Sequence, residues 1–379
     1  MSTRRHKLSA PFTALLLAVP ALNGCGSDHA PAPPALSKAA LDAVIAKPGI
    51  SRAGLARRID TLFADPEAGE TRALLVMQGG RIIAERYAPG YGKDTRFAGW
   101  SMSKTITGVL IGLLVSDGRL QLDESPPVPA WQRPGDPRGE ITLRQLLQMR
   151  SGLRHTESGD PPYSSDEVRM LFLDGRDDMA AHAEAMPLEA EPGRTFEYSS
   201  ATSVILADLA AHALTLRREP DVRRQAVAEY LRTRIFEPLG MRSAVGEYDA
   251  AGTFIGSSMV HATARDWARL GEFLRNSGSV RGAQIVPRGW IDFMTAPSPR
   301  NPAYGAQLWL NRPRGRGDEA MFPAPVPASA FACVGHLGQY VLVLPAQKLT
   351  VVRLGHSDHA QRSALKRHMA GITGLFARP

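Results

Sequence analysis

Short apolar runs separated by turn residues occur towards both ends of the sequence. Residues 73–77 and 81–87 are rich in strand-forming side chains and flank a Gln-Gly-Gly turn, which predicts a β-hairpin. Residues 339–344 and 349–354 are nearly continuous apolar runs on either side of a four-residue turn, which predicts a second hairpin. A helical pattern over 360–376 follows the second hairpin.

The middle of the chain has the helical period instead, and no long strand pair interrupts it. We therefore expect an α/β (α+β) fold in which residues 46–120 and 251–379 form one domain and residues 121–250 form an inserted, mostly helical domain. A functional site in such a fold is expected between the two parts. The helices expected in the insert cover 143–149, 178–185, 203–216 and 226–236.

The segment Ser101-Met102-Ser103-Lys104 places a hydroxyl and an amine one helical turn apart. Residues 105–115 are almost wholly apolar and lead to a glycine stop signal at Gly118, so the serine and lysine open a buried helix. A serine hydroxyl is a weak nucleophile until a base takes its proton, and a lysine can be that base if burial lowers its pKa. Ser101 is therefore a candidate nucleophile and Lys104 its activator.

The S-x-x-K pattern alone is weak, and the chain contains a second copy, Ser363-Ala364-Leu365-Lys366. This copy continues through Arg367 and His368 and is typical of the solvated face of an amphipathic helix. We therefore favour the first copy as the catalytic one.

Two other segments carry groups that an acylating serine needs. Tyr198-Ser199-Ser200 precedes a predicted helix, and a phenol can shuttle protons when a nearby ammonium favours its phenolate form. Glycines in Gly335-His336-Leu337-Gly338-Gln339 let a strand edge approach a ligand closely. Considered singly, the tyrosine and the histidine are more often packing or surface residues.

Patterns for several other functions are missing. The context of Ser101 lacks the second glycine of a nucleophile elbow, which disfavours an α/β-hydrolase triad. There is no H-E-x-x-H, no paired-cysteine spacing for zinc, and no dinucleotide or P-loop fingerprint. The net charge of +8 comes mostly from scattered arginines, which favours a solvated basic surface over a nucleic-acid partner.

The first 45 residues predict export and membrane attachment. Arg4, Arg5 and Lys7 precede a short apolar run, and Leu22-Asn23-Gly24-Cys25 resembles a bacterial lipobox. We expect residues 1–24 to be a lipoprotein signal peptide, Cys25 to be lipidated, and residues 25–45 to be a flexible tether. The protein would then face the periplasm from a bacterial membrane. Ordinary signal cleavage without lipid stays an alternative.

The three motifs, in the order S-x-x-K, Y-x-S and H-x-G, resemble the serine β-lactamase and penicillin-binding-protein superfamily. The similarity is closest to class C β-lactamase-related serine hydrolases, in the branch of 6-aminohexanoate-dimer hydrolases and related esterases. It implies an antiparallel sheet flanked by helices and no metal or organic cofactor. Ser101 would be acylated, Lys104 would accept or relay its proton, and Tyr198 would shuttle protons. His336, Gly338 and Ser200 would line the cleft, and the backbone N–H groups of Ser101 and Gln339 would bind the oxyanion.

The sequence departs from β-lactamases at two of these motifs. Ser200 replaces the asparagine of Y-x-N, and His336 replaces the lysine of K-T-G. A histidine is largely uncharged at neutral pH, whereas recognition of the β-lactam carboxylate needs positive charge. We therefore expect hydrolysis of carboxylic esters or small linear amides. A peptidoglycan-directed DD-peptidase or weak β-lactamase is one alternative, and a non-catalytic envelope binding protein is another.

Overall fold

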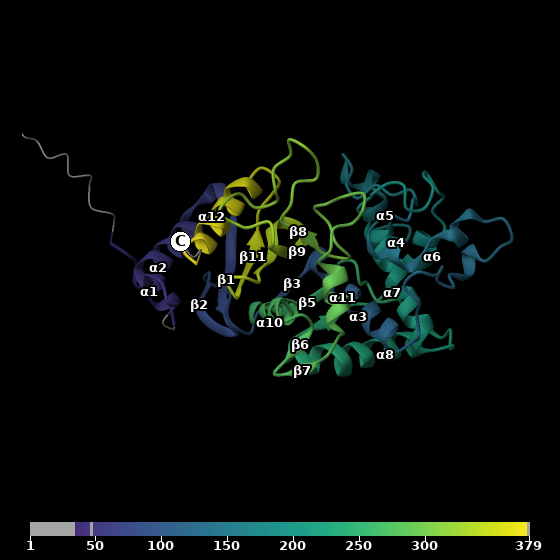
Figure 1. Cartoon of the computed structure of the whole chain (residues 1–379), viewed down its shortest axis with the longest axis horizontal. Coiled ribbons are helices and arrows are strands. Elements are labelled where there is room, and N and C mark those ends of the chain that lie inside the picture. The colour runs from purple at the N-terminus through teal and green to yellow at the C-terminus, as the bar shows by residue number, and fades with distance from the viewer. Residues whose placement is uncertain (1–34, 46–47, 377–379) are drawn as a thin grey trace, which may run out of the picture. The chain divides into compact units, whose positions relative to one another are not determined.

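The centre of the fold is a six-stranded antiparallel sheet with the order β2-β1-β11-β10-β9-β8 (Figure 1). The computed structural model describes residues 35–45 and 48–376. Both predicted hairpins are present, β1 with β2 and β10 with β11. β1 also pairs with β11, with Val76 opposite Val351, so one sheet joins segments far apart in the sequence. The six strands are β1 (Glu70–Gln78), β2 (Arg81–Tyr87), β8 (Trp309–Leu310), β9 (Phe331–Gly335), β10 (Gln339–Leu344) and β11 (Leu349–His356).

Two smaller sheets complete the strands. One has the order β3-β5-β4, and the other is the hairpin of β6 and β7. The sequence pattern did not predict these short strands, since two to four residues give too little periodicity to detect. They are β3 (Arg96–Ala98), β4 (Val245–Gly246), β5 (Val260–Thr263), β6 (Ser279–Val280) and β7 (Ala283–Gln284).

Both faces of the large sheet are buried. Along β1, Ala73, Leu75 and Met77 pack into one apolar core, while Leu74 and Val76 pack into a second core on the opposite face. The second core also contains apolar side chains of α1, α2 and α12, and α10 contacts β1, β10 and β11 on the first face. This two-sided burial explains the nearly continuous apolar runs of these strands.

Helix α3 has buried residues on every side and packs against α7, one of the helices of the middle segment. The expected helices occur with shifted ends. α7 begins at Ser200 because Ser199 caps it, and α8 begins at Pro220, a residue suited to the first helical position. The helices are α1 (Lys38–Ala43), α2 (Arg52–Ala64), α3 (Ser103–Ser116), α4 (Leu143–Leu147), α5 (Asp166–Phe172), α6 (Met179–Glu184), α7 (Ser200–Leu214), α8 (Pro220–Leu231), α9 (Glu237–Leu239), α10 (Ala264–Arg275), α11 (Arg288–Met294) and α12 (Arg362–Gly374).

Helix α1 corrects the expected extent of the tether. It lies inside residues 25–45, Ser37 caps its first turn, and Ala40 and Ala43 are buried. The folded part of the chain therefore begins before residue 46, because these small apolar side chains pack against the second core. No helix in the described ranges is both long enough and apolar enough to cross a bilayer.

The packing of α3 against α11 (Arg288–Met294) depends on a glycine. A Cβ at Gly112 would lie 2.2 Å from Trp290 Nε1, and that indole nitrogen donates a hydrogen bond to the Gly108 carbonyl at 3.0 Å. We expect Gly112→Ala to lower the free energy of unfolding by about 1–2 kcal/mol, since overpacking outweighs the gain in helix propensity. Urea unfolding measures this change.

Gly371→Ala in α12 is the matched control, because its Cβ would come no closer than 3.4 Å to the flexible guanidinium of Arg58. We expect that variant to be as stable as the wild type or more stable. Equal unfolding midpoints for Gly112→Ala and Gly371→Ala would contradict this account of the packing.

Candidate active site

Ser101 lies in a 3₁₀ turn (Trp100–Met102) that leads directly into α3. Trp100 has a φ of +48°, in the left-handed region that a bulky side chain rarely adopts. Such backbone strain is concentrated at functional sites, where surrounding structure maintains it. Ser101 is partly exposed, while Lys104, one turn further along, is 1% exposed. The first S-x-x-K motif therefore presents its hydroxyl and buries its amine.

Lys104 Nζ donates hydrogen bonds to three acceptors from three parts of the chain. They are Ser101 Oγ at 3.1 Å, Ser200 Oγ at 2.9 Å and the carbonyl oxygen of Ser257 at 3.1 Å. An ammonium has three N–H donors and no acceptor, so this arrangement satisfies it completely. The predicted residues Ser101, Lys104 and Ser200 thus meet around one buried nitrogen.

The sequence motifs did not indicate the Ser257 carbonyl as a partner of Lys104. Two side chains of α3 hold the segment that carries it. Thr107 Oγ1 donates to the Gly256 carbonyl at 2.8 Å, and Ser103 Oγ accepts from the Val260 N–H at 3.0 Å. These bonds hold residues 256–260 along the helix. Ser103 therefore supports the segment opposite Lys104.

The pair Glu157 and Glu167 was missed by the sequence analysis. Glu157 Oε1 accepts from Ser200 Oγ at 2.7 Å, and Glu157 Oε2 accepts from the Ser200 backbone N–H at 2.7 Å. That N–H belongs to the first turn of α7, where helix N–H groups lack partners within the helix and favour an anion. His155 Nε2 lies 2.7 Å from Glu157 Oε2, and Lys104 Nζ lies 3.8 Å from Glu157 Oε1.

Burial acts to lower the pKa of Lys104, as the sequence analysis supposed, but the net shift is upward. The neighbouring acidic groups, Tyr198, Glu157 and Glu167, outweigh the desolvation. Burial raises the pKa of Tyr198, so its phenol is neutral at pH 7, and the anion beside Lys104 is then the carboxylate of Glu157, 3.8 Å from Nζ. The pKa of Glu157 is lowered despite its burial, chiefly by the charge of Lys104. Lys104 is therefore an ammonium in the resting site rather than a free base.

Ser200 Oγ has more partners than its single proton can serve. It accepts from Lys104, donates to Glu157, and also lies 3.1 Å from Glu167 Oε1. The last contact is a hydrogen bond only if Glu167 carries a proton and donates it. Burial and the charge of Glu157 raise the pKa of Glu167 to about 7, which supplies that proton below neutral pH.

Tyr198 lies against the same ammonium, with Lys104 Nζ 4.9 Å from the centre of its ring. Its ring packs at 5.3 Å from Trp309 and at 5.8 Å from Tyr304. The Tyr304 hydroxyl is buried and has no hydrogen-bond partner within the described residues. The Y-x-S motif is therefore part of the same cluster as the S-x-x-K motif.

The third motif lies beside the nucleophile turn. β9 passes so close that a Cβ at Gly335 would lie 2.3 Å from the Gly99 carbonyl oxygen, so only glycine fits there. The His336 ring contacts the Trp100 ring edge to face, with centres 5.4 Å apart. Partial burial, then repulsion from Arg362 and His356, lower the pKa of His336, so this side chain is neutral at pH 7.

Gln339 and Gly338 take part in hydrogen bonds that hold the turn after β9. Gln339 Nε2 donates to the carbonyls of His336 at 2.9 Å and Gly355 at 2.7 Å, and its Oε1 accepts from the Gly355 N–H at 2.9 Å. Arg353 Nη1 donates to the Gly338 carbonyl at 2.9 Å. The side chain of Gln339 is thus directed into the turn, which leaves only its backbone for the predicted oxyanion role.

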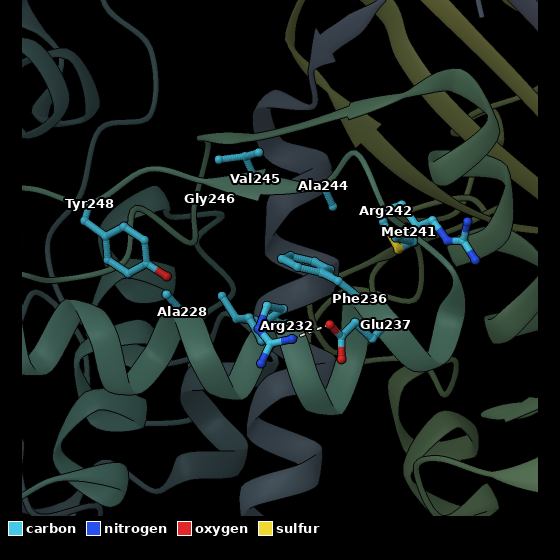
Figure 2. Close-up of a pocket in the computed structure, with 11 residues that line it drawn as sticks. Ala228, Arg232, Phe236, Glu237, Met241, Arg242, Ala244, Val245, Gly246 and Tyr248 are labelled. Atoms are coloured by element: carbon cyan, nitrogen blue, oxygen red, sulfur yellow. Dashed lines mark hydrogen bonds and ion pairs between the residues drawn. The ribbon is translucent and has the colours of Figure 1, made fainter. Parts of the chain in front are cut away.

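Other candidates lie apart from this cluster. Ser363 and Lys366 of the second S-x-x-K copy are on α12 and line a different cavity. A pocket of about 390 Å³ beside α8 and β4 is lined by residues 228–248 and by none of the predicted site residues (Figure 2). Figure 2 shows Arg232 and Glu237 paired along that pocket. Cys25 lies outside the described residues.

Comparisons with known proteins agree with the motifs. The family model for beta-lactamase matches residues 59–373. The chain belongs to the beta-lactamase family. It is 28% identical over 250 residues to the 6-aminohexanoate-dimer hydrolase of Paenarthrobacter ureafaciens, covering 64% of this chain and 61% of that protein. The match thus spans about three fifths of the length of this relative.

Solved structures of other proteins share the fold. A family VIII carboxylesterase superposes with a TM-score of 0.61 at 15% identity, covering 85% of this chain and 98% of that chain. A D-stereospecific amidohydrolase from Streptomyces sp. superposes with a TM-score of 0.58 at 20% identity, covering 82% of this chain and 97% of that chain. These likenesses confirm the predicted fold class.

The carboxylate of Glu157 should be needed for the stability of this beta-lactamase-family site. Replacing it in Glu157→Gln leaves the buried ammonium of Lys104 without its nearest anion, so we expect the free energy of unfolding to fall by about 1–3 kcal/mol. Glu247→Gln is the control, because Glu247 pairs with His261 at the surface. Urea unfolding at pH 7 measures both, and equal losses would contradict a special role for Glu157.

The proton on Glu167 predicts a pH dependence of stability. Its pKa rises from 4.5 to about 7 on folding, so the native state keeps a proton that the unfolded chain loses. This contribution is complete below pH 4.5 and is lost as the pH rises through about 7, a change of at most about 3 kcal/mol. In unfolding measurements between pH 4.5 and 8, Glu167→Gln should be less sensitive to pH than the wild type. Parallel pH curves would contradict the assignment.

Proposed function

We propose that this protein is a serine hydrolase that forms an acyl-enzyme on Ser101 and hydrolyses carboxylic esters or small linear amides. One observation carries the proposal, the continuous hydrogen-bonded path from Ser101 Oγ through Lys104 Nζ and Ser200 Oγ to Glu157 Oε1. A non-catalytic binding protein has no need of such a path. The arrangement instead suits the transfer of a proton away from a nucleophilic hydroxyl.

In the proposed acylation step, Ser101 attacks the substrate carbonyl while its proton moves to Lys104. Lys104 stays an ammonium because it passes one of its own protons to Ser200, whose hydroxyl proton moves to Glu157. The bond between Ser101 Oγ and the acyl carbon forms as the bond to the leaving group breaks. The negative charge thereby moves from Glu157 to the reacting oxygen, next to Lys104, and Lys104 does not have to be a neutral amine in the resting site.

Tyr198 is the proposed proton donor to the leaving group. Its phenol is neutral at rest because burial raises its pKa, and the adjacent Lys104 stabilises the phenolate that remains after transfer. The deacylating water then returns a proton to Tyr198 as it attacks the acyl carbon. Ser101 recovers its own proton from Glu157 along the same path, which restores the starting state. The backbone N–H groups of Ser101 and Gln339 are proposed to bind the oxyanion.

The third motif and the relatives support the proposed substrate class. Neutral His336 stands where a β-lactamase has a lysine, so the positive charge that binds a β-lactam carboxylate is missing at this position. The relatives include a 6-aminohexanoate-dimer hydrolase, a carboxylesterase and an amidohydrolase. We also propose export and membrane attachment through a lipid on Cys25, which the sequence of residues 4–25 alone supports.

The test is the hydrolysis of p-nitrophenyl acetate together with labelling by a fluorophosphonate probe. We expect Ser101→Ala to abolish labelling, and Ser101→Ala and Lys104→Ala each to lower kcat/KM by at least about 10³-fold, because nucleophile and proton relay act as one unit. Ser363→Ala, in the second S-x-x-K copy, is the matched control and should keep wild-type rates with this ester, which carries no charge.

Labelling that survives Ser101→Ala but disappears in Ser363→Ala would overturn the proposed nucleophile. Rates unchanged by Lys104→Ala would overturn the proton path. A chromogenic cephalosporin tests the alternative of β-lactamase activity, and acylation of Ser101 by a penicillin tests the alternative of a DD-peptidase. Turnover of the cephalosporin at rates comparable to the ester would contradict the proposed preference.

A further inference from the structure

A cavity of about 740 Å³ lies between α12 and the segment that connects β8 to β9. It differs from the pocket of Figure 2, and it contains Ser363 and Lys366 of the second S-x-x-K copy. We call it the α12 cavity. Its charged and aromatic lining residues are Trp309, Arg312, Arg314, Lys366, Arg367 and the pair Asp318 and Glu319.

The α12 cavity has an excess of positive charge. Four cationic side chains line it against two carboxylates, and Arg362 adds a further cation from the same helix. Within the described residues, Arg312, Arg314, Arg362 and Lys366 form no ion pair with a carboxylate, although Asp318 and Glu319 lie on the same wall. The Nε of Arg362 is buried without a hydrogen-bond partner there. A buried guanidinium donor without an acceptor is costly, and an anion would satisfy it.

The positive charge of Lys366 also has no carboxylate beside it that offsets its burial. Burial lowers its pKa, and the charges of Arg362 and Arg314 lower it further, while no carboxylate opposes the shift. Lys104 is the contrasting case in this protein, since nearby acids there more than offset burial. The α12 cavity therefore has a net positive charge, with four cations against two carboxylates.

The α12 cavity shares a wall with the candidate active site. Trp309 lines the cavity, and its ring packs at 5.3 Å from the ring of Tyr198. The guanidinium of Arg314 lies over the Trp309 ring, 5.5 Å from its centre. On the other side, the charge of Arg362 reaches His336 of the third motif. Trp309 therefore lies between Tyr198 of the candidate active site and the cations of the α12 cavity.

We propose that the α12 cavity is a subsite for a carboxylate at the far end of the substrate, bound by Arg314 and Lys366 with Arg362 behind them. This inference rests on the proposed hydrolase function and narrows its substrate class to linear esters or amides that end in a carboxylate. His336 is neutral and supplies no positive charge beside the nucleophile. Arg314 and Lys366 supply it in the α12 cavity instead. A planar guanidinium together with an ammonium suits a carboxylate.

The test compares matched substrates that differ only in that charge. One pair is the 4-nitrophenyl monoester of suberic acid and its methyl ester, with the carboxylate on the acyl chain. The other pair is 4-acetoxybenzoate and its methyl ester, with the carboxylate on the leaving group. We expect kcat/KM to favour the charged member of at least one pair by about fivefold or more, mainly through KM, and the preference to weaken as salt is added.

The variants Arg314→Gln, Lys366→Gln and the double variant should remove that preference, so that the ratio of charged to neutral kcat/KM approaches one. Arg242→Gln, an exposed arginine that lines the other pocket, is the matched control and should keep the wild-type ratio. A wild-type ratio of one for both pairs, or a preference that survives the double variant, would overturn the subsite.

The same experiment separates this inference from the proposed function. If Ser101→Ala abolishes hydrolysis of every ester but charged and neutral members react equally, the hydrolase stands and the subsite fails. If hydrolysis persists in Ser101→Ala, the proposed function fails, and any charge preference must then belong to a different catalytic group.

Discussion

The buried ammonium of Lys104 is the constraint on which the rest of the site depends. A cation that is 1% exposed requires acceptors for each N–H group and a nearby anion. Three separate segments meet that requirement, through Ser101 at the start of α3, Ser200 at the start of α7 and the carbonyl of Ser257. Glu157 supplies the anion and is itself held by the N-terminus of α7. Because the buried ammonium of Lys104 needs these partners, its burial brings together the groups that an acylating serine needs.

The same buried charge determines the surroundings of Ser200 in the Y-x-S motif. A serine hydroxyl is short, so it leaves room for carboxylates, and it can accept from Lys104 while donating to Glu157. The site then has carboxylates on the α7 side, a neutral histidine beside the nucleophile, and unneutralised cations beyond Trp309.

Much of this arrangement could be predicted from the sequence, for identifiable reasons. The hairpins of β1 with β2 and of β10 with β11 are local, and their apolar runs are long enough to detect. Ser101, Lys104 and Tyr198 belong to short motifs in a recognisable order. Glu157 and Glu167 were missed because their role comes from tertiary contact with Ser200, and no local spacing marks it. The same reason explains why the net pKa shift of Lys104 is upward, since its direction depends on the tertiary neighbours Tyr198, Glu157 and Glu167.

In the resting site, Lys104 is an ammonium with an acceptor for each of its three N–H groups. The most direct measurement is the ¹⁵N NMR titration of Nζ in protein labelled at lysine, with the Lys104 signal assigned by its loss in Lys104→Met. The account predicts an ammonium signal for Lys104 at pH 7 that persists to a higher pH than in Glu157→Gln. A neutral amine at pH 7 in the wild-type protein would contradict it.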